Sequence, residues 1–169
     1  NGRMITKTDP AGYTISYAYD SNGKLLSSTD PNGKIRTMTY NPSTTTSTLT
    51  EKDGGVWTYA YDPTILKVTK KTDSLGNVTQ YTYAANRNLL TQTDPGNSVT
   101  TYTYDSAGNI TSSKDPLGNT TTYTYNSLNL VTGITDPMGN ITQYTYDANG
   151  NMLTMTDPAG AVTQYQYDS

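Results

Sequence analysis

The chain repeats itself about every twenty-one residues, and this period constrains its fold more than any single motif does. Repeats of this length are typical of stacked arrays, because one unit is too small to bury its own apolar face and must share it with a neighbour. The sequence therefore predicts one array of eight units over residues 1–169. Each unit is anchored on an acidic residue: Asp9, Asp30, Glu51, Asp73, Asp94, Asp115, Asp136 and Asp157.

Both ends of the chain fall in the middle of a unit. Residues 1–4 align with residues 22–25, and the chain stops shortly after a tyrosine pair. Natural ends of repeat arrays are expected to carry atypical polar capping units. We therefore expect this sequence to be an excerpt from a longer repeat polypeptide.

Tyrosine occupies two fixed slots in each unit, eight and ten residues after the anchor. Fifteen of the sixteen tyrosines lie in these slots, Tyr13 lies outside them, and Met38 takes one slot in place of tyrosine. Because side chains alternate across a β-strand, the two tyrosines of a pair point to the same face. The sequence predicts a structural ladder of Tyr17, Tyr19, Tyr40, Tyr59, Tyr61, Tyr81, Tyr83, Tyr102, Tyr104, Tyr123, Tyr125, Tyr144, Tyr146, Tyr165 and Tyr167.

Two turn signals, both of the form acid-x-x-Gly, alternate along the repeats. Asp accepts hydrogen bonds from amides of its own turn, Pro presets φ near −65°, and Gly supplies the left-handed residue of a bulged hairpin. A second signal follows the tyrosine pair at residues 20–23, 105–108 and 147–150. The first signal predicts these turn residues: Asp9, Gly12, Asp30, Gly33, Asp115, Gly118, Asp136, Gly139, Asp157 and Gly160.

The segments between the turns are rich in β-branched and aromatic residues, so each unit is predicted to be one β-hairpin. Return strands carry Leu25, Val68, Leu89, Ile110, Val131 and Met152 in one slot, which we expect beside the tyrosines. About sixteen strands exceed the ~10 that an open twisted sheet usually holds. The predicted fold class is all-β, with tandem hairpins in a curled antiparallel sheet that forms a tube or spiral shell. A two-layer sandwich and a parallel β-solenoid are the alternatives.

Composition excludes several classes of function. The net charge is −3 and no basic stripe is present, which argues against nucleic acid as a partner. No apolar run approaches membrane-spanning length, so membrane insertion is not expected. The chain has no Cys and no His, which removes thiol nucleophiles, His-based triads and the usual zinc sites. We expect no enzyme activity, no catalytic or metal-binding residues and no cofactor.

Repeated Asp and Tyr side chains also admit functional readings. A row of carboxylates can bind Ca²⁺ or act on a glycoside, but turn capping already accounts for Asp in acid-x-x-Gly. The tyrosine rows fit packing, carbohydrate stacking or electron hopping, and packing is favoured because a small aromatic gain recurs in every unit. Trp57 replaces the usual Thr of its slot. We interpret it as a packing substitution, with a contact patch as the alternative.

The consensus D-P-x-G-N-x-T-x-Y-x-Y-D-x-x-G-N-L-x-x-x-T resembles the RHS or YD repeat, and residues 104–110 and 146–152 are close copies. That family includes bacterial Rhs and wall-associated proteins, toxin-complex shell subunits and teneurins. The resemblance implies a spiral of β-hairpins that forms a hollow shell, which in the toxins encloses an effector. Residues 36–72 match least well, and the C-terminal self-cleaving core segment of the toxins has no counterpart here.

Two functions follow as expectations. The first is a non-enzymatic extracellular or cell-surface structural module that builds a hollow β-shell or a tubular surface fibre. Its partners are further copies of the repeat, in the same chain or by self-assembly, and an enclosed effector domain. The alternative is an adhesion module whose tyrosine-rich strands bind surface glycans. Nearly identical units favour the structural function, because a specific site usually needs one place that differs from the rest.

Overall fold

The computed structural model describes residues 2–168, so the chain ends Asn1 and Ser169 lie outside the described residues. All regular structure in this part is β-strand, with no helix. No helix of the described residues has the length and apolarity needed to cross a membrane. The strands are hydrogen-bonded in sequence order, from β1 to β16, and neighbouring strands with a recorded register are antiparallel. The predicted all-β hairpin fold is confirmed, and the sandwich and the parallel solenoid are excluded.

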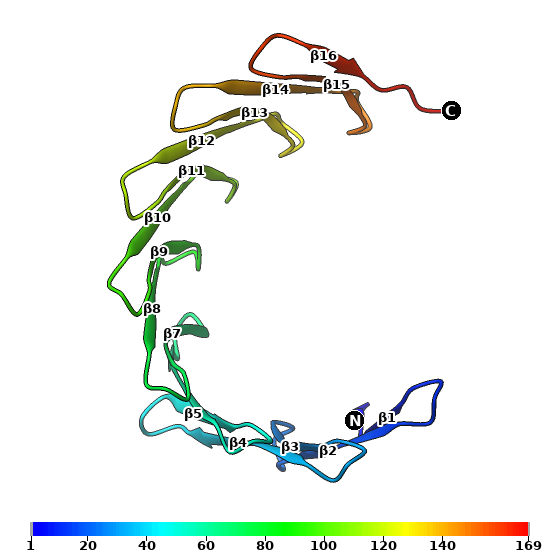
Figure 1. Ribbon diagram of the computed structural model, residues 1–169, viewed down its shortest axis with the longest axis vertical. Helices are drawn as coiled ribbons and strands as arrows, with labels where there is room; N and C mark the ends of the chain where they lie inside the picture. The colour runs from blue at the N-terminus through cyan, green and yellow to red at the C-terminus, as the bar shows by residue number, and fades with distance from the viewer. Residues whose placement is uncertain (1, 169) are drawn as a thin grey trace. The chain divides into compact units, whose positions relative to one another are not determined.

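The chain divides into two compact parts, each of which contains several repeats. Unit 1 covers residues 1–81 and unit 2 covers residues 82–169, with the boundary inside β8. Within each unit the sheet is bent rather than flat (Figure 1). Unit 1 contains β1 (Thr6–Thr8), β2 (Thr14–Tyr19), β3 (Leu25–Thr29), β4 (Ile35–Asn41), β5 (Thr46–Thr50), β6 (Val56–Asp62), β7 (Lys67–Thr72) and the start of β8 (Val78–Tyr83). Unit 2 contains β9 (Leu89–Thr93), β10 (Val99–Tyr104), β11 (Ile110–Lys114), β12 (Thr120–Tyr125), β13 (Val131–Thr135), β14 (Ile141–Tyr146), β15 (Met152–Thr156) and β16 (Val162–Gln164).

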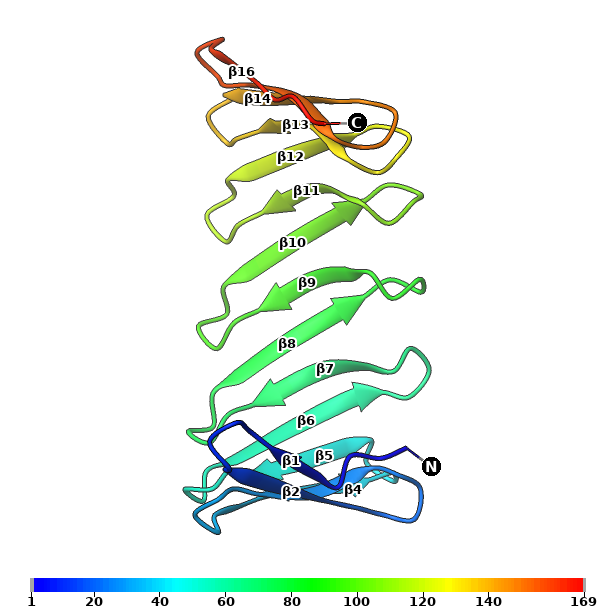
Figure 2. The same cartoon turned by 90° about the vertical axis from the view of Figure 1, so that its right-hand side faces the viewer.

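The two turns of each repeat lie at opposite edges of the sheet (Figure 2). We call the edge with the acid-anchored turns, such as residues 115–119, the first-turn edge. The opposite edge carries the turns that follow the tyrosine pairs, such as residues 105–109, and we call it the second-turn edge. Each strand therefore runs from one kind of turn to the other, as the spacing of the two signals predicts.

The two kinds of hairpin pair differently. Across the second turn, β14 and β15 pair from Gln143↔Thr156 to Tyr146↔Met152, with a bulge just before the tyrosine. Across the first turn, the pairing of β13 with β14 stops three residues from the turn, at Gly133↔Gln143. The strands therefore separate toward the second-turn edge, and this one-sided separation is repeated along unit 2.

The apolar slot of the return strands lies beside the tyrosines, as predicted. The register pairs Tyr19 with Leu25, Tyr104 with Ile110, Tyr125 with Val131, Tyr146 with Met152 and Tyr61 with Val68. None of the described side chains is fully buried, so the sheet has no conventional core. Stability must therefore come from many half-buried contacts and from hydrogen bonds.

Candidate functional site

The first turn of most repeats is held by its own anchor carboxylate. In residues 115–119, Asp115 Oδ1 accepts the backbone N–H of Leu117 and of Asn119, both at 2.9 Å. Asp115 Oδ2 accepts the Asn119 side-chain amide at 2.8 Å, and the backbone N–H of Gly118 donates to the Asp115 carbonyl at 3.0 Å. Both carboxylate oxygens of Asp115 thus accept hydrogen bonds from within the same turn, and we call this arrangement of an Asp side chain the Asp clasp.

Most of the anchors predicted from the sequence make the same pair of backbone contacts, whereas the Glu51 carboxylate accepts a hydrogen bond from Arg36 and the Asp94 carboxylate accepts one from Gln92. The acceptor in each case is the Oδ1 atom, and the donors lie two and four residues later. These contacts are Asp9 with Ala11 and Tyr13, Asp30 with Asn32 and Lys34, Asp136 with Met138 and Asn140, and Asp157 with Ala159 and Ala161. The predicted glycines all have positive φ, at 87° for Gly12, 76° for Gly33, 90° for Gly118, 87° for Gly139 and 84° for Gly160.

Hydrogen bonding to the ionised carboxylate lowers the pKa of several clasp residues below the ordinary value of 3.8. A side-chain amide four residues later is the main cause for Asp73, Asp105, Asp115, Asp136 and Asp147. The main cause for Asp30 is its hydrogen bond from Lys52. These carboxylates are therefore ionised and hydrogen-bonded within their turns at neutral pH, which makes them poorly suited to proton transfer there.

The second tyrosine of a pair spans the gap where strands separate. The hydroxyl groups of Tyr104, Tyr125 and Tyr146 donate to the carbonyls of Leu89, Ile110 and Val131, each at 2.8 Å. Tyr19 makes the same bond to Met4 in unit 1. Partial burial raises the pKa of Tyr104, Tyr125 and Tyr146 above 10.0, so the neutral phenol is favoured.

The ladder tyrosines lie at the same level of burial throughout most of the array. Those of β2, β4, β6, β8, β10, β12 and β14 are half-buried. Tyr165 and Tyr167, which follow β16, are 38% and 52% exposed. The rings are thus covered enough to pack but are not sealed from water.

The stretch from residue 36 to residue 72, which matches the repeat least well, also differs in structure. Here β5 pairs over its full length with both β4 and β6, without a bulge. Tyr40 donates to the Met38 sulfur at 3.5 Å instead of to a carbonyl. Thr45 and Leu66 replace glycine at positive φ, at 50° and 53°. The strands of this stretch therefore stay together where the others separate.

The sequence did not predict the contacts between neighbouring second turns. Asn109 donates from Nδ2 both to Asp105 Oδ2 and, at 2.9 Å, to Asn129 Oδ1 in the next second turn. Leu130 lies 3.3 Å from the place where a Cβ on Gly150 would stand, so these turns also touch. An Asn lies four residues after the Asp of many acid-x-x-Gly segments, and this spacing could have indicated that its side chain bonds the turn.

In the repeats that follow the consensus, the residues that bear chemistry are spread evenly rather than gathered. Within residues 2–168, no group of three or more acidic side chains is placed to hold a metal ion. The clasps of Asp115 and Asp136 are closed by amides of their own turns, whereas Asp30 also accepts a hydrogen bond from Lys52 of the next repeat. The repeated geometry can hold turns and strands in register.

Comparison with solved structures shows the same fold in much larger proteins. The chain is similar to the structure of a TcdB2-TccC3-Cdc42 assembly, with 22% identity and a TM-score of 0.66, over 90% of this chain and 9% of that chain. It is also similar to a Photorhabdus luminescens Tc holotoxin pore with a mutated TccC3, with 21% identity and a TM-score of 0.69, over 92% of this chain and 10% of that chain. The chain thus spans about a tenth of these structural relatives. No protein of curated function matches it in sequence.

The family resemblance seen in the consensus is confirmed by the sequence matches. The RHS Repeat family matches residues 1–35, 19–44, 84–120, 104–137, 125–162 and 146–169. These segments cover well over half of the chain and omit most of the stretch with the altered pairing. The chain belongs to the RHS Repeat family.

Proposed function

We propose that the chain is a non-enzymatic structural module, and that its repeats form part of the wall of a hollow β-shell or tubular fibre outside the cell. The observation that carries the proposal is the bond from the second tyrosine to the preceding strand. It recurs with one geometry at Tyr104, Tyr125 and Tyr146. A bond that is repeated unit after unit serves the sheet as a whole, whereas a binding or catalytic site needs one place that differs.

The tyrosine–carbonyl bond also suits the mechanics of a curved wall. Strands that separate on one side would leave backbone carbonyls without donors, which costs free energy if water is excluded. The phenol supplies a donor at the end of a rigid, largely apolar ring. The strands of the wall can therefore separate toward the second-turn edge while their carbonyls keep hydrogen-bond donors.

The family supports the choice of partners. Several of the similar solved structures are assemblies of TcdB2 with TccC3, and one of them also contains Cdc42. By analogy, the partners proposed for this chain are further repeats of the same kind and an effector protein held inside the wall. An array of eight units over residues 1–169 would then be one segment of that wall.

Adhesion through the tyrosine rows has less support. Three phenol groups that would hydrogen-bond a sugar already donate to backbone carbonyls, and their rings are half-covered by neighbouring strands. A glycan would have to compete with these internal bonds.

Electron microscopy of the full-length polypeptide tests the proposal. We expect a hollow particle or tube whose wall is one sheet thick. Limited proteolysis should spare an enclosed segment until the wall is unfolded. A solid particle without a lumen, in which every other domain is cleaved as readily as in isolation, would contradict the shell, and the absence of elongated tubes would contradict the fibre.

A further inference from the structure

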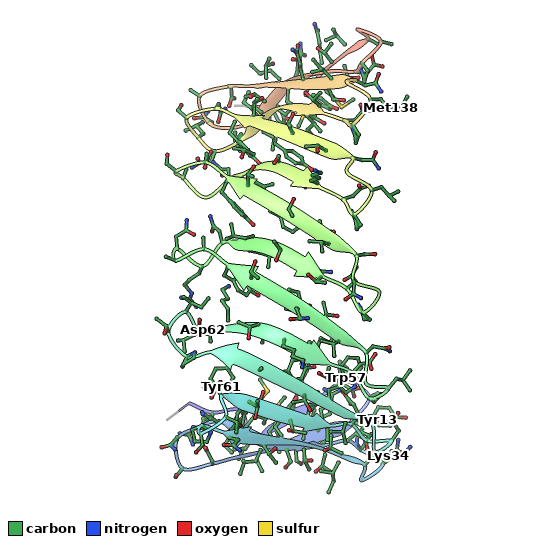
Figure 3. The ribbon with its side chains drawn as sticks, turned by 90° about the vertical axis from the view of Figure 1, so that its left-hand side faces the viewer. Tyr13, Lys34, Trp57, Tyr61, Asp62 and Met138 are labelled. Atoms are coloured by element: carbon green, nitrogen blue, oxygen red, sulfur yellow. The ribbon has the colours of Figure 1, made fainter. Side chains whose placement is uncertain are left out.

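One second turn, residues 84–88, lacks the side-chain oxygen that holds the others. In every other second turn within residues 2–168, the first residue is Asp or Asn, and its Oδ1 atom accepts backbone N–H groups of its own turn. These residues are Asp20, Asn41, Asp62, Asp105, Asn126 and Asp147. Figure 3 shows one of them, Asp62, at the second-turn edge of unit 1. The corresponding residue of the turn 84–88 is Ala84, which has only a methyl group.

The backbone of residues 84–88 nevertheless has the shape of a clasped turn. The Ala84 N–H donates to the Asn88 carbonyl at 2.9 Å, and the Arg87 N–H donates to the Ala84 carbonyl at 2.9 Å. The next second turn, which begins at Asp105, closes with the same two bonds, at 3.0 and 3.2 Å. The turn of residues 84–88 therefore keeps the backbone geometry that surrounds a clasp carboxylate.

The donors that a clasp carboxylate binds elsewhere are present in this turn. Asn109 Nδ2 donates to Asp105 Oδ2 at 2.9 Å, whereas the corresponding nitrogen of Asn88 is buried without a hydrogen-bond partner in the described chain. The N–H of Ala107 donates to Asp105 Oδ1, but its counterpart in Asn86 has no acceptor among the described residues. The Asn88 N–H donates to Asn86 Oδ1, at a longer 3.2 Å. A buried donor without an acceptor costs free energy, so this turn favours an added acceptor.

An open cleft of unit 2 lies beside these donors. Its volume is about 310 Å³, and its lining includes Ala84, Asn86, Asn88 and Asp105. This volume is at the lower end of the range of about 300–1,000 Å³ typical of small-molecule sites. Asn88 Nδ2 lies 3.9 Å from the place where a Cβ on Gly108 would stand, so the next second turn lies close to this nitrogen. The cleft therefore suits a small ligand that accepts hydrogen bonds.

The charges near the cleft are compatible with an anion. Arg87 belongs to the same turn, is exposed, and forms no ion pair with another described residue. Asp105 is the charged residue that lines the cleft, and its carboxylate accepts three hydrogen bonds from its own turn. Carboxylates of successive repeats already coexist at the first-turn edge, where Asp115 and Asp136 each form a clasp. A carboxylate one repeat away from Asp105 would reproduce that arrangement.

We propose that this cleft binds a carboxylate, which takes the place of the Asp side chain that Ala84 lacks. One carboxylate oxygen accepts from Asn88 Nδ2 and the other from the Asn86 N–H, which reproduces the clasp of Asp105. Hydrogen bonds to an ionised acceptor are stronger than those to a neutral one, so the site selects a carboxylate over an amide. The group belongs either to a free organic acid or to an acidic side chain of a partner protein. The inference holds whether or not the array closes into a shell.

Amide NMR measures binding at the donors themselves. Acetate should be titrated into the protein at constant pH and ionic strength, with chloride as the ionic control and acetamide as the neutral analogue of the same shape. We expect a saturable shift of the Asn88 side-chain amide and of the Asn86 N–H with acetate, and none with chloride or acetamide.

An acidic peptide distinguishes the two sources of the carboxylate. The blocked tripeptide acetyl-Gly-Asp-Gly-amide should be titrated in the same way. Tighter binding of the peptide than of acetate would assign the site to an acidic side chain of a partner protein, and equal or weaker binding would assign it to a free organic acid. No saturable shift with either carboxylate, or an equal shift with acetamide, would overturn the proposal.

Matched variants separate binding at this cleft from a general effect of charge. Ala84→Asp supplies the carboxylate from within the chain, so its affinity for acetate should fall at least about tenfold, the effect of losing a charged hydrogen bond. Asn126→Asp adds the same charge to a second turn whose Oδ1 atom is already hydrogen-bonded, and it should leave the affinity unchanged. Circular dichroism and thermal unfolding will show that both variants fold. Unchanged affinity in folded Ala84→Asp would contradict the assignment.

Discussion

The Tyr146 hydroxyl donates a hydrogen bond to the carbonyl of Val131, fifteen residues earlier, over 2.8 Å. This bond crosses the gap that opens where β13 and β14 stop pairing. We expect Tyr146→Phe to lower the free energy of unfolding by about 0.5–1.5 kcal/mol, the usual net value of one hydrogen bond. Chemical denaturation measures it.

Tyr144→Phe is the matched control for Tyr146→Phe. Tyr144 lies on the same strand and face, and its hydroxyl makes no hydrogen bond to another described residue that would be lost. Its removal should change stability by less than half as much. Equal effects of the two variants would show that the hydroxyl bond contributes nothing specific.

A glycine of the first turn provides the second prediction. Gly118 has φ near 90°, where an L-residue costs about 1–2 kcal/mol, so Gly118→Ala should destabilise the protein by that amount. Gly96 is the control, because its φ is not left-handed and a Cβ there would meet open space. Gly96→Ala should be neutral or slightly stabilising, since it reduces the freedom of the unfolded chain. A loss of stability as large in Gly96→Ala as in Gly118→Ala would contradict this account of the turn.

The second turn of residues 84–88 lacks its clasp. Ala84 takes the place of the Asp, and the Asn88 side-chain nitrogen is buried with no hydrogen-bond partner in the described chain. Ala84→Asp should supply the missing acceptor, as Asp105 does for Asn109, and should raise the free energy of unfolding by about 0.5–1.5 kcal/mol.

Ala85→Asp, one residue later, adds the same charge at a place where it cannot reach Asn88 in the clasp geometry. It should not stabilise the protein. A gain from Ala85→Asp equal to that from Ala84→Asp would assign the effect to charge rather than to the clasp.

The shifted pKa values predict how stability depends on pH. Asp73, Asp105, Asp115, Asp136 and Asp147 have lowered pKa values, so their contribution is complete above the ordinary Asp value of 3.8 and is lost as pH falls below it. Tyr104, Tyr125 and Tyr146 have raised pKa values, so their contribution is complete below 10.0 and is lost as pH rises further. Thermal unfolding between pH 2 and 11 should show a broad plateau with a decline at each end. A maximum confined to one side of neutrality would contradict these assignments.

The sequence was sufficient to predict the hairpins, their turns and the residues that face each other, because the 21-residue period fixes the turn spacing and strand alternation fixes the face. It did not predict where the strands would separate. That depends on the hydroxyl of Tyr146 reaching a carbonyl of another strand, and a phenol in a pattern does not indicate its acceptor. The cleft beside Asn88 was also missed, because it depends on how closely the next second turn brings Gly108 to the Asn88 side chain. The length of one repeat does not show which side chains of neighbouring repeats will be in contact.

If the tyrosine pairs hold neighbouring repeats together as a wall, hydrogen exchange will change in a Tyr123→Ala, Tyr125→Ala double variant. Both rings are half-buried, so we expect a loss of about 3–5 kcal/mol for the pair. Exchange should accelerate over residues 104–146 and much less elsewhere, because repeats depend on their nearest neighbours. The control is Thr122→Ala, Thr124→Ala on the exposed face of the same strand, which loses one exposed hydrogen bond, between Thr124 and Thr132, and should change protection much less. Protection over residues 104–146 that is the same in both double variants would contradict this role of the tyrosine pairs.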